Sequence, residues 1–396
     1  MDFEDARTVG ARLRRIRHVR RKSLVVVAGL AGISKSHLSR IERGEVALDS
    51  RSETVALANA LGVSPSELIR LPVPAPGNGG NDVALVAVRS ALMAVSRNQP
   101  GGQVVPLDAL RSRVRALLVA ERECRNADVG AALPALIRDM HASIAVGGNV
   151  AELLELAVSM HTQGSLWLKN MGAEVELWSL ATLAARQAAE RRDDPVMLGL
   201  ALWADGLVLL AAGDFDLARN QLESVTVPTN SPESTQLAGM LGLCRSLVAA
   251  ADKRHADVDA ALEYAGELAE RTGEGNAYSL GFGPTNVGLW RMAAAVEVKD
   301  YERAVAVAER LNPRVHPNRS RQAAYWLDYG RALARLPRRR EDAVMALYRG
   351  ETLSPLHSQR NPFVREILAE LVARWPRRDA VGDLLRAMAH RAGLPV

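Results

Sequence analysis

The segment that decides the fold is LRRIRHVRRKSLVVVAGLAGISKSHLSRIERG at residues 13–44, which is followed by LANALGVSPSELI at residues 57–69. Its apolar residues recur at helical spacing, with polar or basic residues on the other faces. Ser23 and Ser34 are typical N-cap residues, and Gly32 is typical of the end of a helix. The segment therefore predicts five short helices, of which the second and third are joined by a very short turn.

The excess of positive over negative charge in the chain is concentrated in this segment. Between Arg7 and Arg43 there are 11 basic residues and one acidic residue, Glu42. Residues 71–396 hold 37 basic and 37 acidic residues, so the net charge of +5 comes from the first 70 residues. Such a local excess of positive charge suits a polyanionic partner, although a solvated basic helix has the same composition.

The SRIERG and ALGVSPSEL stretches, together with the short turn at Gly32, resemble the Xre-type (Cro-like) helix-turn-helix domain over nearly its whole length. The resemblance implies that the third helix, residues 34–43, lies in the major groove of double-stranded DNA. Glu42 is expected to pair with Arg17 of the first helix, which accounts for the single acid in a basic run. By position, Lys35, Ser36 and Arg40 are expected to face base edges and Ser39 and Arg43 to lie nearer phosphates; the full set predicted for DNA binding is Lys35, Ser36, His37, Ser39, Arg40 and Arg43.

The second helix departs from this family pattern, because it reads SLVVVAG where a polar sequence is usual. Leu24 stands where a phosphate-holding polar group is common, and Val25 and Val26 stand on the face expected to be wet. Two interpretations remain open: these valines pack on a neighbouring segment, or they contact the C-terminal region or a second subunit.

The rest of the chain also predicts helices, so the fold class is all-α. The predicted domains are a five-helix domain at 1–71, a Pro- and Gly-rich linker at 72–82 and a helical repeat region at 83–396. The repeat region resembles tetratricopeptide-like superhelices, and both domains together resemble actinobacterial Xre-type regulators with such a region. Small or aromatic residues near the start of every second helix mark the repeats, at Trp178, Ala218, Ala260, Ala304 and Ala343, with spacings of 40, 42, 44 and 39 residues.

A loop between two repeats is the predicted site for an effector. Gly273, Gly275, Gly281 and Gly283 precede a helix that Pro284 begins, and backbone N–H groups at a helix start can hold an anionic or carbonyl group. An ordered turn between repeats is the alternative. The residues predicted to bind a peptide or small-molecule effector are Tyr278, Phe282, Thr285, Asn286 and Trp290.

Several classes of function find no support in the sequence. Zinc-protease, hydrolase, phosphate-loop and dinucleotide-binding motifs are missing, so neither an enzyme nor a cofactor is predicted. The two cysteines, Cys124 and Cys244, and the scattered histidines lack metal-ligand spacing. The acidic start MDFEDA is unlike a signal peptide, and we expected no membrane span, so a reduced cytoplasm is the predicted compartment.

Two functions follow from these observations. The first is a homodimeric transcriptional regulator that binds a palindromic operator, with the repeat region carrying the dimer contact and sensing the effector. The second is a protein-binding adaptor whose N-terminal domain binds DNA weakly or not at all because of its altered second helix.

Overall fold

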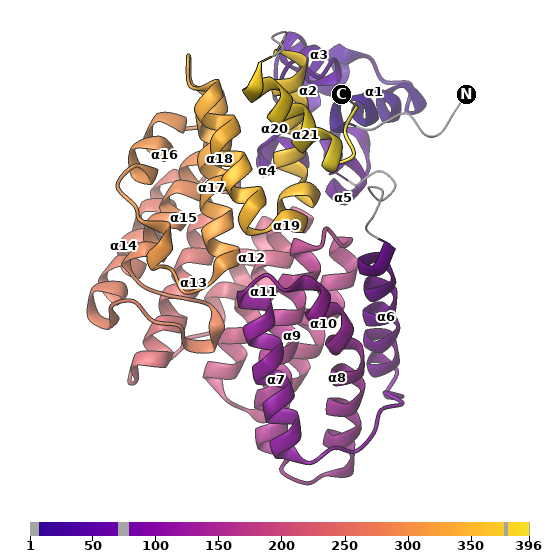
Figure 1. The fold of residues 1–396 in the computed structure, drawn as a ribbon, viewed down its shortest axis with the longest axis vertical. Helices are drawn as coiled ribbons and strands as arrows, with labels where there is room; N and C mark the ends of the chain where they lie inside the picture. The colour runs from indigo at the N-terminus through magenta and orange to yellow at the C-terminus, as the bar shows by residue number, and fades with distance from the viewer. Residues whose placement is uncertain (1–7, 70–78, 376–378, 396) are drawn as a thin grey trace.

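The computed structural model describes residues 8–69, 79–375 and 379–395 (Figure 1). Over these residues the chain forms 21 α-helices, two short 3-10 helices and no β-strand, which confirms the predicted all-α fold class. The one bridge of strand type in the described part joins Gly275 to Phe282.

The head, residues 8–69, contains the five predicted short helices: α1 (Val9–Val19), α2 (Leu24–Leu30), α3 (Lys35–Glu42), α4 (Arg51–Leu61) and α5 (Pro65–Ile69). The hydroxyls of Thr8, Ser23, Ser34 and Ser50 accept backbone N–H groups at the starts of α1 to α4, and each thereby satisfies a donor that the helix leaves free. The apolar stripes meet in one core, whose fully buried members include Leu13, Val27, Leu38, Ile41, Leu57 and Leu68.

The array, residues 79–395, holds the remaining helices. They are α6 (Gly79–Ser96), α7 (Leu107–Arg122), α8 (Asn126–Val146), α9 (Val150–Asn170), α10 (Val175–Arg192), α11 (Pro195–Ala212), α12 (Phe215–Glu223), α13 (Pro232–Ala251), α14 (His255–Thr272), α15 (Pro284–Glu297), α16 (Tyr301–Ala308), α17 (Arg319–Arg335), α18 (Arg340–Leu353), α19 (Pro355–Arg360), α20 (Pro362–Ala373) and α21 (Ala380–Arg391), with the 3-10 helices η1 (Ala277–Ser279) and η2 (Pro313–Val315).

From α9 to α18 successive helices pack as pairs, and the fourth residue of each second helix is buried against its neighbours. These residues are Trp178, Ala218, Val258, Ala304 and Ala343. Ala260, which the sequence analysis assigned to this position in α14, is exposed and lies two residues beyond Val258. The assignment was wrong because HADVDA contains a buried valine at the position where α12, α16 and α18 have alanine.

Close approach within a pair is clearest between α17 and α18. A side chain at Gly330 would stand 2.7 Å from the Leu347 side chain and 3.2 Å from the backbone oxygen of Ala343. A glycine at this position therefore lets the two helix backbones approach each other.

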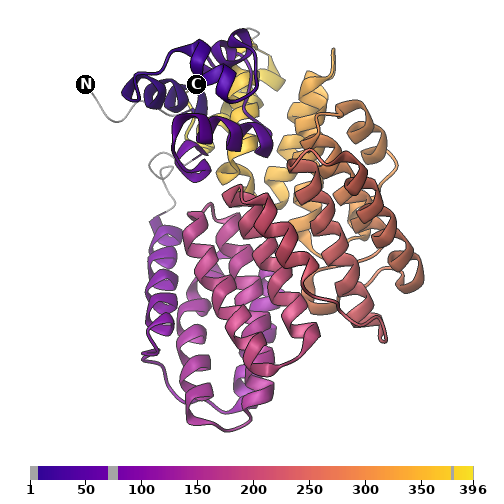
Figure 2. The same cartoon turned by 180° about the vertical axis from the view of Figure 1, so that it is seen from behind.

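The head is seated on the array, beside α20 and α21 at the C-terminal end of the chain (Figures 1 and 2). Ala47 is buried among side chains of α17, α18, α20 and α21. The backbone N–H of Val9 donates to Glu366 Oε1 at 2.9 Å, and that of Ala47 donates to Glu370 Oε2 at 2.8 Å. Buried hydrogen bonds thus hold the head on the array, in addition to the covalent link between the two parts.

The predicted linker, 72–82, is shorter in the structure, since α6 begins at Gly79. Gly79, Gly80 and Asn81 form the first turn of this helix, although glycine disfavours helix interiors. Residues 72–78 lie outside the described part.

Two described helices, α8 and α11, are long and apolar enough to cross a membrane by length and composition, contrary to our expectation from the sequence. Here α8 and α11 lie among other helices of the array, and about half of the apolar stretch of each helix is buried. Asp205 of α11 accepts a hydrogen bond from Thr182 at 2.8 Å.

Candidate nucleic-acid interface

The outward face of α3 is polar and basic. Leu38 and Ile41 point into the head core, which leaves Lys35, Ser36 and Arg40 exposed on the other side. The Arg40 side chain is 47% exposed, so its guanidinium is open to a partner. The hydroxyl of Ser34 caps the N-terminus of α3. The major groove of DNA is wide enough to admit an α-helix such as this one.

Arg17 and Glu42 come together as the sequence analysis expected. Arg17 Nε donates to Glu42 Oε1 at 2.6 Å and Arg17 Nη2 donates to Glu42 Oε2 at 2.8 Å, so the pair is bidentate. Both side chains are nearly buried, and the hydrogen bond raises the pKa of the guanidinium. The pair ties α1 to α3 and keeps the Glu42 charge away from the outward face.

Two of the predicted DNA-binding residues have partners inside the protein. His37 is half-buried, and its Nε2 lies 3.2 Å from Glu53 Oε1 of α4. Glu53 in turn lies 2.5 Å from Lys299 Nζ of the array. Ser39 Oγ accepts a hydrogen bond from Arg43 Nη1 at 2.6 Å. His37 and Ser39 thus each have a partner within the protein.

Glu45 is a residue that the sequence analysis missed. Its carboxylate accepts from Arg43 Nε at 2.5 Å and from Arg43 Nη2 at 3.0 Å, and it lies 3.9 Å from Arg40 Nε. The hydrogen bond from Arg43 lowers the pKa of this carboxyl. An acid placed one residue after Gly44 could have indicated this contact, because the helix ends there and the chain turns back toward the last turn of α3. In the free protein Glu45 offsets part of the positive charge of the face.

Several apolar residues of α2 are exposed, although Val27 and Ala28 of the same helix are buried in the core. Val25 and Val26 are 60% and 49% exposed, and Leu30 of the same helix and Val19 at the end of α1 are also exposed. Over the described residues these side chains keep about half or more of their surface open, which favours contact with a second subunit or another partner.

A comparison with protein-family models places residues 8–71 in a family described as a helix-turn-helix domain. The head is a helix-turn-helix domain. In domains of this type the second helix of the motif reads the major groove, and in this chain that helix is α3. Neither the curated proteins nor the solved structures include a match to the chain.

The residues predicted to bind an effector do not line a common opening. Phe282 is buried, and its ring fills the space beside Gly239, where a side chain would overlap it. Asn286 is fully buried, and its Nδ2 donates to the backbone oxygen of Gly281 at 2.5 Å. The Thr285 N–H at the start of α15 donates to Glu274 Oε1 at 2.8 Å.

The helix start that seemed free for an anion is thus already occupied by a carboxylate of the chain itself. Tyr278 is partly buried, and its backbone oxygen accepts from Gln163 at 3.1 Å. Of the five predicted residues, Trp290 alone lines the large cavity that lies between the helix-turn-helix domain and the array. Several polar groups of this loop thus have partners within the chain, and effector binding by these residues stays a prediction.

Proposed function

We propose that the protein is a sequence-specific transcriptional regulator of Xre type that binds double-stranded DNA through α3. The observation that carries the proposal is the exposed basic face of α3 on a helix-turn-helix domain. Lys35 and Arg40 are the residues that contact bases, and an arginine in the major groove can donate two parallel bonds to guanine. Arg43 and the basic α1 supply attraction to phosphates.

The proposal includes a homodimer on a palindromic operator, with half-sites about one helical turn, roughly 34 Å, apart. A single five-helix domain contacts few bases, and two linked copies gain affinity through effective concentration. In this account the array is a tetratricopeptide-like domain that carries the dimer contact and senses a peptide or small-molecule effector. The protein works in the cytoplasm, without catalytic activity, cofactor or membrane.

A fluorescence-anisotropy titration of the full chain with labelled DNA from its own promoter tests the proposal. Specific binding at a dissociation constant of about 10⁻⁸ M or tighter, and at least 10³-fold weaker binding to a scrambled duplex, is the expected result. Equal and weak binding to both duplexes contradicts it. Sedimentation of the full chain and of the array alone tests the dimer in parallel.

The exposed valines of α2 favour one other function. An adaptor that recruits a protein needs an accessible apolar surface, and Val25, Val26 and Leu30 provide a small one. Replacing Val25 and Val26 together by Ser separates the two functions. Because the array carries the dimer contact, the regulator keeps its operator affinity in this variant, whereas the adaptor loses a protein partner and has no operator to bind.

A further inference from the structure

A cavity of about 1050 Å³ lies where the helix-turn-helix domain meets the array. On the domain's side Thr54 and Val55 of α4 and Pro65 and Ile69 of α5 line it. On the opposite side α9, α11, α15, α17 and α20 line it. Any molecule held in this cavity would therefore touch both parts of the protein.

Two basic side chains of the array, Lys169 and Arg321, line this cavity. Lys169 and Arg321 are surrounded by protein, yet both keep part of their surface open to the cavity. Among the described residues neither forms an ion pair with a carboxylate. Arg321 Nη2 donates to Asn286 Oδ1 at 3.2 Å, and its guanidinium lies 5.2 Å from the centre of the Trp290 ring.

Their environment disfavours the charge that they carry. Burial lowers the pKa of Lys169 to about 8 and that of Arg321 to about 10. Repulsion from Arg321 and Arg51 lowers the pKa of Lys169 further, so these cations face the same space. Lys169 is in the last turn of α9, whose C-terminal dipole offsets about half a unit charge.

Asp328 and Glu121 are the acids that act on these two cations, and they do not balance them. Asp328 is paired with Arg331 at 2.7 Å. Glu121 is buried, and desolvation raises its pKa to about 7, so near neutral pH a large part of it is protonated. A buried charge without a partner is costly, and a negatively charged ligand would remove that cost here.

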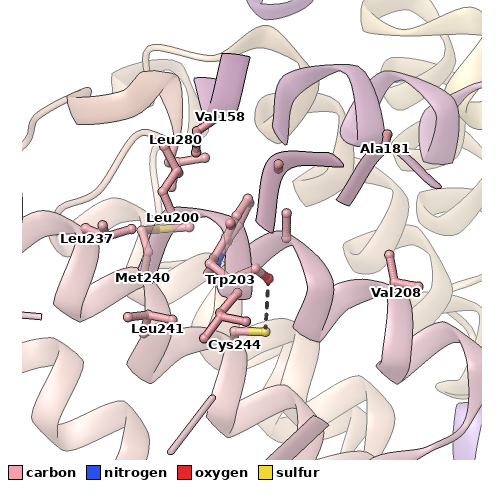
Figure 3. Close-up of a cluster of buried hydrophobic side chains, with 14 of the residues drawn as sticks. Val158, Ala181, Leu200, Trp203, Val208, Leu237, Met240, Leu241, Cys244 and Leu280 are labelled. Atoms are coloured by element: carbon pink, nitrogen blue, oxygen red, sulfur yellow. Dashed lines mark hydrogen bonds between the residues drawn. The ribbon is translucent and has the colours of Figure 1, made fainter. Parts of the chain in front are cut away.

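The remaining wall is largely apolar and aromatic. Trp203, Met240 and Leu280 come from three separate segments and lie together in one cluster, in which Cys244 Sγ approaches the backbone oxygen of Trp203 at 4.0 Å (Figure 3). Trp178 and Trp290 add two more rings to the lining. Polar and charged side chains line the rest of the cavity, so its wall has an apolar part and a polar part, as a site for an amphipathic small molecule requires.

We infer that this cavity binds a small amphipathic anion, whose negative group lies between Lys169 and Arg321 and whose apolar body lies on Trp178, Trp203 and Trp290. This inference rests on the proposed regulatory function, because the cavity would be the effector site of that regulator. Since α4 and α5 form part of the wall, the bound anion would alter how the DNA-binding domain sits on the array.

Two fluorescent probes that differ in one group test the inference on the full chain. 8-Anilinonaphthalene-1-sulfonate is an aromatic anion, and N-phenyl-1-naphthylamine is the same aromatic body without the sulfonate. Quenching of the cavity tryptophans and the fluorescence of the probe report binding. We expect one molecule of the anionic probe per chain, bound at least 10-fold more tightly than the neutral probe.

Lys169→Met and Arg321→Met should each weaken binding of the anionic probe at least 10-fold and leave the affinity for the neutral probe unchanged. Arg310→Met, a matched change at an exposed arginine of the array, should alter neither. Lys169→Met should also raise the melting temperature of the ligand-free protein, since it removes a buried charge. Equal affinity of the wild type for both probes overturns the inference, and so does an anionic-probe affinity that both Met variants leave intact.

DNA binding is measured separately in the absence of probe. Failure there overturns the proposed function and leaves the cavity assignment standing. Failure of the probe experiment overturns the cavity assignment and leaves DNA binding standing.

Discussion

Glu297, the last residue of α15, fixes the DNA-binding domain to the array, and its removal tests that attachment. Its buried carboxylate accepts from Arg51 N at 2.7 Å, from Ser52 N at 3.2 Å and from Arg51 Nη1 at 2.8 Å. An array side chain thus completes the N-terminus of α4, where free N–H groups and the helix dipole favour a negative charge.

The loss in Glu297→Ala follows from these contacts. Hydrogen bonds to a charged group contribute about 1.5 to 3 kcal/mol each and do not add fully, and breaking a buried ion pair costs about 3 to 5 kcal/mol. Because the Arg51 side chain is 27% exposed and can regain water, we take the lower end, about 3 kcal/mol.

Hydrogen–deuterium exchange of the full chain measures this effect locally. A loss of about 3 kcal/mol corresponds to roughly 100-fold faster exchange of the α4 amides. Glu302→Ala, at an exposed carboxylate five residues further along, is the matched control and should leave α4 unchanged. Unaltered α4 exchange in Glu297→Ala would refute the reasoning that the array caps this helix.

Three further changes have defined outcomes. Glu42→Ala leaves the buried Arg17 guanidinium without its partner, so thermal unfolding should show a loss of about 3 kcal/mol, and a loss below about 0.5 kcal/mol would argue against a structural pair. Glu45→Ala removes the carboxylate beside Arg43, so anisotropy should show about 3- to 10-fold tighter binding to all DNA sequences, whereas weaker binding would mean that Glu45 orients that arginine. Burial raises the pKa of Glu366 from 4.5 to about 7. The folded chain therefore keeps a proton that the unfolded chain loses, and this contribution to stability disappears as the pH rises from about 4.5 through 7. Glu366→Gln should then raise the melting temperature at pH 8 and change it little at pH 4, and a difference independent of pH would contradict the assignment.

The sequence predicted the helix-turn-helix domain well because its determinants are local. Caps at Ser23 and Ser34, a turn at Gly32 and apolar residues at helical spacing act within a few residues of each other. The Arg17–Glu42 contact could be expected as well, since one acid in a basic run needs a partner. The contacts of Glu297, Glu366 and Glu370 with this domain join residues more than 240 positions apart, and nothing local in the sequence indicates them.

The contacts of the predicted effector residues were harder to foresee for a related reason. Glycines before a helix indicate a permissive backbone, but they do not show whether the freed N–H groups already have a partner, which Glu274 supplies here. The proposed anion site depends on Lys169 and Arg321, which are 152 residues apart in sequence. No motif in the sequence around either residue indicates the site. Only the folded array brings them together.

The central claim is that α3 reads base sequence, and a comparison of Arg40→Ala with Arg43→Ala on selected and scrambled duplexes tests it most directly. The operator is first selected from a random DNA pool with the wild-type chain, and affinities are then measured at several salt concentrations. Arg40→Ala should weaken binding to the operator by about 1 to 3 kcal/mol and relax the base preference at one position of each half-site. Its binding to scrambled DNA should change little. Arg43→Ala should weaken binding to both duplexes by the same factor. It should also lower the slope of log affinity against log salt concentration by about one unit. If no sequence is enriched from the pool, or if Arg40→Ala weakens both duplexes by the same factor, α3 does not read bases as described.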